Sequence, residues 1–147
     1  MLTLKYVLMC QAVAVVSALA TRSGLGDWHA SLKKPWFNPP NWVFGPVWTV
    51  LYVLMGVAAA RVHLDPVCRG LFFLQLGLNG LWSFLFFGWR RPGLALIDIA
   101  LLWASIAACV AYFAPVDVWA ARLLWPYWAW VSFASLLNFE IWRLNRR

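Results

Sequence analysis

Tryptophan is the residue type that most plainly offers chemistry in this chain. Twelve of the 147 residues are Trp, and four of these lie within residues 28–48 together with four of the eight Pro. Each indole carries a large apolar π-face and one N–H donor, which suits it to contact with a flat hydrophobic molecule. A stretch so rich in Pro and polar residues does not cross a bilayer as a helix, so we interpret it as a loop that covers a binding site.

Trp48 and Trp130 lie in different hydrophobic runs and could therefore flank one slot. At helical spacing Trp48 shares a face with Tyr52, and Trp130 shares one with Ala134. Each stacking or edge contact with a π-system contributes roughly 0.5–1.5 kcal/mol beyond area burial. The competing interpretation for any Trp of a membrane protein is the interfacial belt. We assign to that belt the tryptophans at the ends of runs, which are Trp89, Trp119 and Trp142.

A polar stripe follows one face of the third hydrophobic run, formed at helical spacing by Gln75, Asn79, Trp82 and Ser83. An amide inside the hydrocarbon region normally finds a partner on a neighbouring helix. For Asn79, interhelical bonding and ligand contact both stay open. For Gln75 we favour the structural role.

Two acidic residues lie within the later hydrophobic runs, where an acid is a functional candidate by default. Asp98 stands near the start of its run and could cap a helix or meet Arg90 or Arg91. Glu140 lies within reach of Arg143, on the next turn. We favour structural roles for both acids over a proton relay.

The sequence shows no conventional catalytic or metal-binding pattern. His29 and His63 lie outside the hydrophobic runs, whereas a membrane cytochrome needs facing histidines inside its bundle. Cys10, Cys68 and Cys109 form neither a CxxC pair nor a cluster with His, which argues against a disulfide framework or a zinc site. Because no Ser/His/Asp order or phosphate-binding loop is visible either, we expect no metal site and no bound cofactor.

The overall composition indicates an integral membrane protein. The chain is 64% hydrophobic and 12% charged, with a mean hydropathy of +0.73. Soluble domains are about half apolar and about a quarter charged, so this much apolar surface cannot be hidden in a soluble fold of this size. The net charge of +7 lies mostly between hydrophobic runs, which favours contact with lipid headgroups over a nucleic-acid partner.

Five hydrophobic runs divide the chain, at about residues 4–22, 42–62, 70–89, 93–113 and 118–142. We interpret them as the five transmembrane helices of one all-α, multi-pass membrane domain covering residues 1–147. The first run also fits a signal peptide, because it has a basic start and a small-residue pattern at residues 18–20. We favour a retained helix.

The long polar connection after the first run is the predicted lid of the bundle. Its prolines force an extended or turned path, because each fixes its own φ and restricts the residue before it. The residues assigned to the lid are Trp28, Trp36, Pro39, Pro40 and Trp42.

Several strings of residues together resemble the translocator protein (TspO/MBR) family, whose members are also called tryptophan-rich sensory protein and peripheral benzodiazepine receptor. The strings are KPWFNPPNWVFGPVWTVLY at 34–52, QLGLNGLW at 75–82, FFG at 86–88, ALID at 95–98, ARLLWPYWAW at 121–130 and LNF at 137–139. The resemblance covers nearly the whole chain from about residue 28 to 145. It is specific because several unusual strings recur at consistent spacing.

The resemblance implies a five-helix bundle, usually a homodimer, with a pocket closed by the first loop. That pocket binds porphyrins and cholesterol-like or synthetic aromatic ligands. By position, Ala134 matches a small residue whose identity affects ligand binding in the family. The residues that match the pocket or its neighbourhood are Trp48, Tyr52, Asn79, Trp82, Ser83, Trp130 and Ala134.

From the residues and the resemblance together we expect a membrane receptor or carrier. Its ligands would be porphyrins, such as protoporphyrin and haem-type tetrapyrroles, and related flat hydrophobic molecules, linked to tetrapyrrole transport, sensing or homeostasis. The alternative is an enzyme that degrades porphyrin with light and oxygen, in which the resemblance gives Trp48 and Trp130 the catalytic roles. A small-molecule exporter is less favoured, because the first three runs hold no mid-membrane carboxylate for proton coupling.

One departure from the family pattern concerns sterols. Animal members carry a cholesterol-recognition pattern near the end of the fifth helix, and here Phe139 stands where its Tyr would be. Such patterns are weak even when complete. We therefore favour a tetrapyrrole as the ligand and keep a sterol only among the membrane lipids that could be partners.

Overall fold

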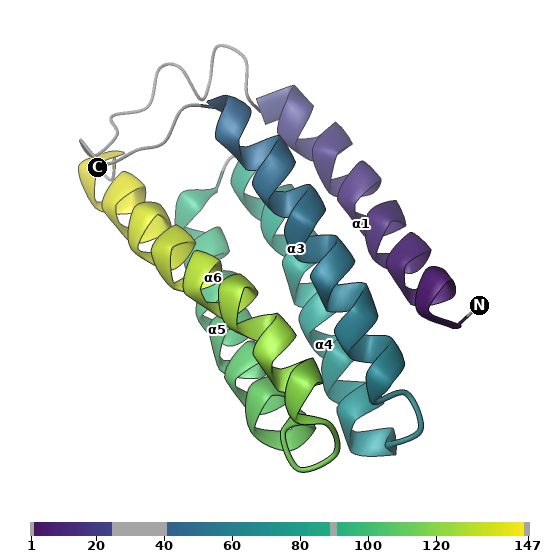
Figure 1. Cartoon of the computed structure of the whole chain (residues 1–147). Helices are drawn as coiled ribbons and strands as arrows, with labels where there is room; N and C mark the ends of the chain where they lie inside the picture. The colour runs from purple at the N-terminus through teal and green to yellow at the C-terminus, as the bar shows by residue number, and fades with distance from the viewer. Residues whose placement is uncertain (1, 25–40, 89–90, 146–147) are drawn as a thin grey trace.

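The computed structural model describes the backbone of residues 2–24, 41–88 and 91–145, and the side chains of these except 17–24, 41–45 and 87–88. The regular structure of this described part is entirely helical, and its elements pack as a bundle (Figure 1). They are α1 (Leu2–Gly24), α3 (Asn41–Arg61), α4 (Pro66–Ser83), the π-helical η1 (Phe84–Gly88), α5 (Pro92–Phe113) and α6 (Val118–Asn145). The expected all-α class is confirmed. Each α-helix coincides with one hydrophobic run to within a few residues, except that α4 and η1 together occupy the run at 70–89.

Local signals place the starts of two helices. The Asp65 side chain accepts a hydrogen bond from the Cys68 backbone N–H, and Pro66 opens the helix where its missing N–H costs nothing. Pro92 opens α5 in the same way. The connections at residues 62–65 and 114–117 are short, so the helices that they join run antiparallel.

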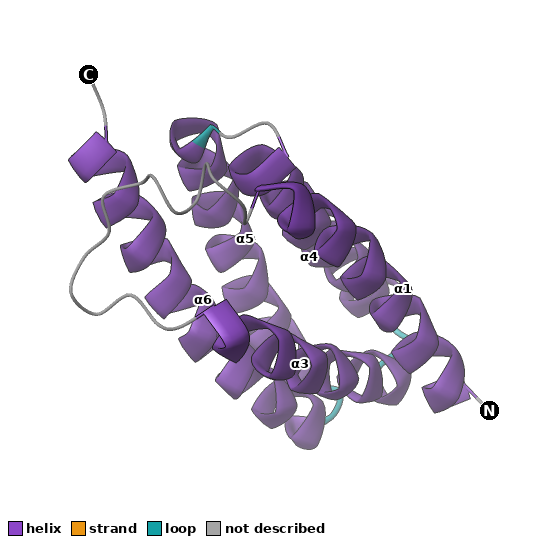
Figure 2. Ribbon diagram, turned by 90° about the horizontal axis from the view of Figure 1, so that it is seen from above, coloured by secondary structure: helices purple, strands orange, loops and turns teal. Residues whose placement is uncertain are grey.

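The chain closes its bundle through pairs of neighbouring helices. α5 packs against both α4 and α6, α3 packs against α1 and α6, and α1 also contacts α4 and η1. The view from above shows α1 on the outside beside α3 and α4 (Figure 2). The α3–α4 and α5–α6 connections lie at one end of the bundle, and the start of α3 and the end of α6 lie at the other (Figure 1).

α1 and α3 approach each other at Gly56. A Cβ added there would lie 2.6 Å from the Cα and 2.8 Å from the N of Val7, so only Gly fits against this backbone. Close approach at small residues is how membrane helices maximise their packing. The first run is therefore a packed part of the bundle, as the retained-helix interpretation requires.

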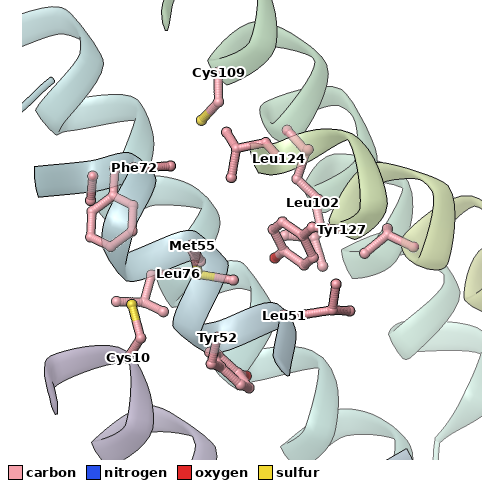
Figure 3. Close-up of a cluster of buried hydrophobic side chains, with 14 of the residues drawn as sticks. Cys10, Leu51, Tyr52, Met55, Phe72, Leu76, Leu102, Cys109, Leu124 and Tyr127 are labelled. Atoms are coloured by element: carbon pink, nitrogen blue, oxygen red, sulfur yellow. The ribbon is translucent and has the colours of Figure 1, made fainter. Parts of the chain in front are cut away.

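Side chains from every helix meet in the core. Cys10 of α1, Tyr52 and Met55 of α3, Phe72 of α4 and Tyr127 of α6 are all almost fully buried (Figure 3). The three cysteines are buried with free thiols. Cys10 and Cys109 pack in the core as small hydrophobes, and the Cys68 thiol donates to the Tyr112 carbonyl across 3.4 Å.

The outward face is strongly apolar. Ile97 and Leu101 on α5 and Trp125 and Leu136 on α6 are each more than half exposed. Of the described helices, α5 is long and apolar enough to cross a membrane, and α1 and α3 contain the shorter apolar segments Leu2–Val16 and Pro46–Arg61. The described residues hold five α-helices, one for each expected run, and the crossing of a bilayer by all five stays a prediction.

Candidate functional site

Trp48 of α3 and Trp130 of α6 are both partly buried and pack together against the core of the bundle. Their ring centroids are 6.3 Å apart and their planes stand at 89°. Trp48 also packs edge-on against Tyr127, at 6.3 Å and 70°, and lies 5.8 Å from Tyr52. Because their rings are perpendicular and in edge contact, the two tryptophans form a corner.

A chain of three hydrogen bonds between side chains lies beside this aromatic corner. The Tyr52 hydroxyl donates to Asn79 Oδ1, and Asn79 Nδ2 donates to the Tyr127 hydroxyl across 2.7 Å. The Tyr127 hydroxyl in turn donates to Gln75 Oε1 across 2.8 Å. These four residues join α3, α4 and α6 through buried polar atoms, and we call them the polar chain.

Both polar atoms of the Asn79 amide take part in the polar chain. Its oxygen accepts from Tyr52 and its nitrogen donates to Tyr127, so the interhelical bonding that the sequence left open is present. Gln75, favoured for a structural role, supplies only its oxygen. Its Nε2 is buried without a hydrogen-bond partner among the described residues.

Tyr127 is the central residue that sequence reasoning missed. It is completely buried, packs against Trp48 and carries two hydrogen bonds of the polar chain. A signal was present in its spacing, because Tyr127, Trp130 and Ala134 stand at i, i+3 and i+7 on one helix face.

The remaining predicted pocket residues lie elsewhere in the same interior. Trp82 stacks on Phe86 at 5.3 Å and donates through Nε1 to Asn138 Oδ1 across 2.9 Å. Asn138 Nδ2 donates in turn to the Pro92 carbonyl, so Trp82 helps to hold α4 against the α5–α6 pair. The other two predicted residues are buried on α4 and α6, and they are Ser83 and Ala134.

The predicted lid lies largely outside the described residues, which is the case for Trp28, Trp36, Pro39 and Pro40. Trp42 is part of α3 by its backbone, and its side chain is outside the described set.

The two acids of the hydrophobic runs differ in their surroundings. Glu140 pairs with Arg143 across 2.6 Å, as expected. Asp98 is buried, and neither carboxylate oxygen has a hydrogen-bond partner among the described residues. The expected cap or contact with Arg91 is wrong, because α5 begins at Pro92 and Asp98 lies nearly two turns inside it, while Arg91 is exposed. Arg90 falls outside the described residues.

An ion pair lies at the end of the bundle where α3 ends and α6 begins. Arg61 Nε, at the end of α3, donates to Asp117 Oδ2 across 2.9 Å just before α6. Asp117 also accepts from the backbone N–H groups of Trp119 and Ala120. Partial burial would raise the pKa of the Asp117 carboxyl, but these hydrogen bonds and the Arg61 charge outweigh it and hold the pKa below its usual range.

Comparison with known proteins places this helical chain in a family. The model described as "TspO/MBR family" matches residues 6–143. The chain belongs to the TspO/MBR family. This confirms the resemblance carried by the Trp- and Pro-rich strings and makes the chain a helical membrane protein.

Relatives in the TspO/MBR family come from bacteria and animals. The tryptophan-rich protein TspO of Chlorobaculum tepidum is 44% identical over 144 residues, covering 93% of this chain and 91% of its own. The tryptophan-rich sensory protein of Cereibacter sphaeroides is 42% identical over 147 residues, covering 98% and 91%. The human translocator protein is 42% identical over 126 residues, covering 80% and 75%.

Proposed function

We propose that this TspO/MBR protein is a membrane receptor or carrier for porphyrins and related flat hydrophobic molecules. The observation that carries the proposal is the corner formed by Trp48 and Trp130, with Tyr52 and Tyr127 packed against it. Four aromatic rings from two helices gather where the polar chain also lies. A macrocycle laid against them would gain edge and face contacts of roughly 0.5–1.5 kcal/mol each.

The names of the relatives support a role in sensing or moving a ligand. One is called a tryptophan-rich sensory protein and another a translocator protein. A porphyrin joins a large π-surface to two propionates, so an aromatic interior near a membrane surface suits it. The physiological role that follows is tetrapyrrole transport, sensing or homeostasis.

The same proposal includes the setting of the site in the membrane. All five helices cross the bilayer, and the connection between α1 and α3 covers the site as a lid. The apolar outward residues of α5 and α6, such as Ile97 and Trp125, contact lipid, which includes sterol where the membrane contains it. The protein acts as a homodimer.

A second candidate function is porphyrin breakdown driven by light and oxygen. The edge contact between Trp48 and Trp130 favours it, because two oxidisable indoles then lie together beside the proposed macrocycle site. In this candidate both tryptophans are catalytic residues, and molecular oxygen is the co-substrate.

The test is a protoporphyrin titration in detergent micelles, followed by the Soret absorption in the dark. We expect saturable binding to the wild type and weaker binding to Trp48→Ala and Trp130→Ala. Trp125→Ala is the matched control, since Trp125 is 55% exposed on the outer face of α6. Unsaturable uptake that equals that of empty micelles would rule the proposal out.

The same samples, illuminated in air, separate the two candidate functions. Degradation predicts a new absorbing product in the wild type that is lost in Trp48→Phe and Trp130→Phe. Equal product yields in the wild type and both variants would remove the enzyme from consideration and leave the receptor or carrier.

A further inference from the structure

We propose that Gln75 is a donor subsite that recognises an uncharged acceptor oxygen on the ligand. This inference rests on the proposed function and deepens it, because it assigns a polar feature that strengthens the binding of the ligands that carry it. The residues of the aromatic corner describe the shape of the ligand. Gln75 adds a preference among such ligands, for those that carry a carbonyl, ester or amide oxygen near the flat apolar body.

The direction of the polar chain leaves one group unused. Protons are donated in one sense along it, from Tyr52 to Asn79, from Asn79 to Tyr127 and from Tyr127 to Gln75 Oε1. The chain ends at Gln75 Nε2, which carries two N–H donors and has no hydrogen-bond partner among the described residues. Gln75 as a whole is 1% exposed.

Flipping the Gln75 amide, which exchanges Nε2 and Oε1, does not give both atoms a hydrogen-bond partner. Nε2 would then face the Tyr127 hydroxyl, whose proton would lose the acceptor that it has now. Oε1 would take the place of the unpaired nitrogen and need a donor. In the arrangement found here, the two N–H groups of Gln75 Nε2 are available to an acceptor on a ligand.

The surroundings of Gln75 decide which acceptor fits. Phe72 and Leu76, its neighbours along α4, are buried in the core beside Met55 (Figure 3). The buried polar residues of the described chain include no Lys, Arg or His. A carboxylate brought here would lack a cation, and burying an unpaired charge is far costlier than burying a carbonyl. The oxygen recognised by Gln75 is therefore uncharged.

Tyr127 connects this subsite to the aromatic corner. Its ring packs against Trp48, while its hydroxyl bonds to the Gln75 side chain. A ligand lying against the corner therefore has the Gln75 amide one residue away. The polar chain holds that amide in place, because Tyr127 anchors its oxygen and leaves its nitrogen as the only free end.

Two neutral porphyrins test the subsite. Mesoporphyrin dimethyl ester and etioporphyrin have similar macrocycles, but only the first carries ester carbonyls. The compared quantity is the affinity for the ester divided by the affinity for etioporphyrin. We expect this ratio to be about three- to tenfold larger in the wild type than in Gln75→Met. Met keeps the length of the side chain but has no N–H donors. Partition into micelles cancels in this comparison, because each probe is measured against both proteins.

Nuclear magnetic resonance of the wild type supplies an independent readout that needs no variant. The chain has two glutamines, so labelling with side-chain 15N-glutamine gives the signals of Gln75 and Gln11 alone. The Gln11 amide, partly exposed on α1, is the internal control. We expect a downfield shift of one Gln75 N–H proton with the ester relative to etioporphyrin, since the macrocycle itself is common to both.

The outcomes distinguish this inference from the proposed function. One outcome overturns only the donor subsite. In it both porphyrins bind, but the affinity ratio is the same in wild type and Gln75→Met, and the Gln75 signals are the same with either probe. If the wild type binds protoporphyrin but neither neutral porphyrin, the subsite alone is overturned. If it binds none of the three, the proposed function fails and the subsite fails with it. If Gln75→Met does not fold, the wild-type spectra decide.

Discussion

Asn79 Nδ2 donates to the hydroxyl of Tyr127 across 2.7 Å, and this bond ties α4 to α6 in the interior of the bundle. The Tyr127 hydroxyl in turn donates a hydrogen bond to Gln75 Oε1. Removing that one oxygen would leave the Asn79 nitrogen and the Gln75 oxygen buried without partners. Stability in this protein therefore depends on a polar group that sits beside its proposed ligand site.

Tyr127→Phe should lower the free energy of unfolding by about 1–3 kcal/mol, because unpaired buried donors and acceptors cost that much. Thermal unfolding in detergent measures the change. Tyr112→Phe is the matched control, since Tyr112 is more than half exposed, and it should be close to neutral. Equal melting temperatures for wild type and Tyr127→Phe would contradict the role of the polar chain.

Gly56→Ala should loosen α1 from α3, because the new Cβ would lie 2.6 Å from the Cα of Val7. The Val7 backbone cannot move aside as the end of a flexible side chain can. We therefore expect the free energy of unfolding to fall by about 1–3 kcal/mol, which is typical of overpacking. Gly77→Ala is the control, since a Cβ there meets nothing within 4 Å. Its effect should be neutral or stabilising by up to about 1 kcal/mol through helix propensity. Limited proteolysis and thermal unfolding compare the two, and identical behaviour would contradict the close approach.

Trp48→Ala and Trp130→Ala should weaken protoporphyrin binding non-additively. Each substitution is expected to cost about tenfold in affinity, and the double variant less than the product of the two. The reason is that each ring positions the other through their 6.3 Å edge contact. The coupling should be about 0.5–1.5 kcal/mol. Strict additivity in the titration would mean that the two indoles act as separate sites.

Acid should destabilise the protein partly through Asp117. Its folded-state pKa lies below the unfolded value, so its stabilising contribution is full at neutral pH and is lost as pH falls through the folded-state pKa. In melting experiments between roughly pH 7 and pH 2, Asp117→Asn should show a shallower loss of stability than wild type. An Asn can still cap the start of α6, so the variant isolates the charge. A slope equal to that of wild type would assign the acid sensitivity to other groups.

Much of the fold could be predicted from residues close together in the chain. The runs at 42–62 and 93–113 became α3 and α5 almost unchanged, because hydrophobicity, Pro and capping residues act locally. The strings around Trp48 and Trp130 indicated the family for the same reason. Asp65 and Pro66 even mark the start of a helix.

The composition and hydrophobic pattern of the sequence by themselves determined an all-helical membrane protein, and its motifs determined the TspO/MBR family. Only the tertiary structure decided that Tyr127 joins Asn79 to Gln75, that Asp98 has no contact with Arg91, and that two indoles meet at a right angle. These features depend on how far each helix is rotated and where it crosses its neighbours. Rotation and crossing are settled by many weak contacts summed over whole interfaces, such as the close approach of α1 to α3, and no short stretch of sequence encodes that sum.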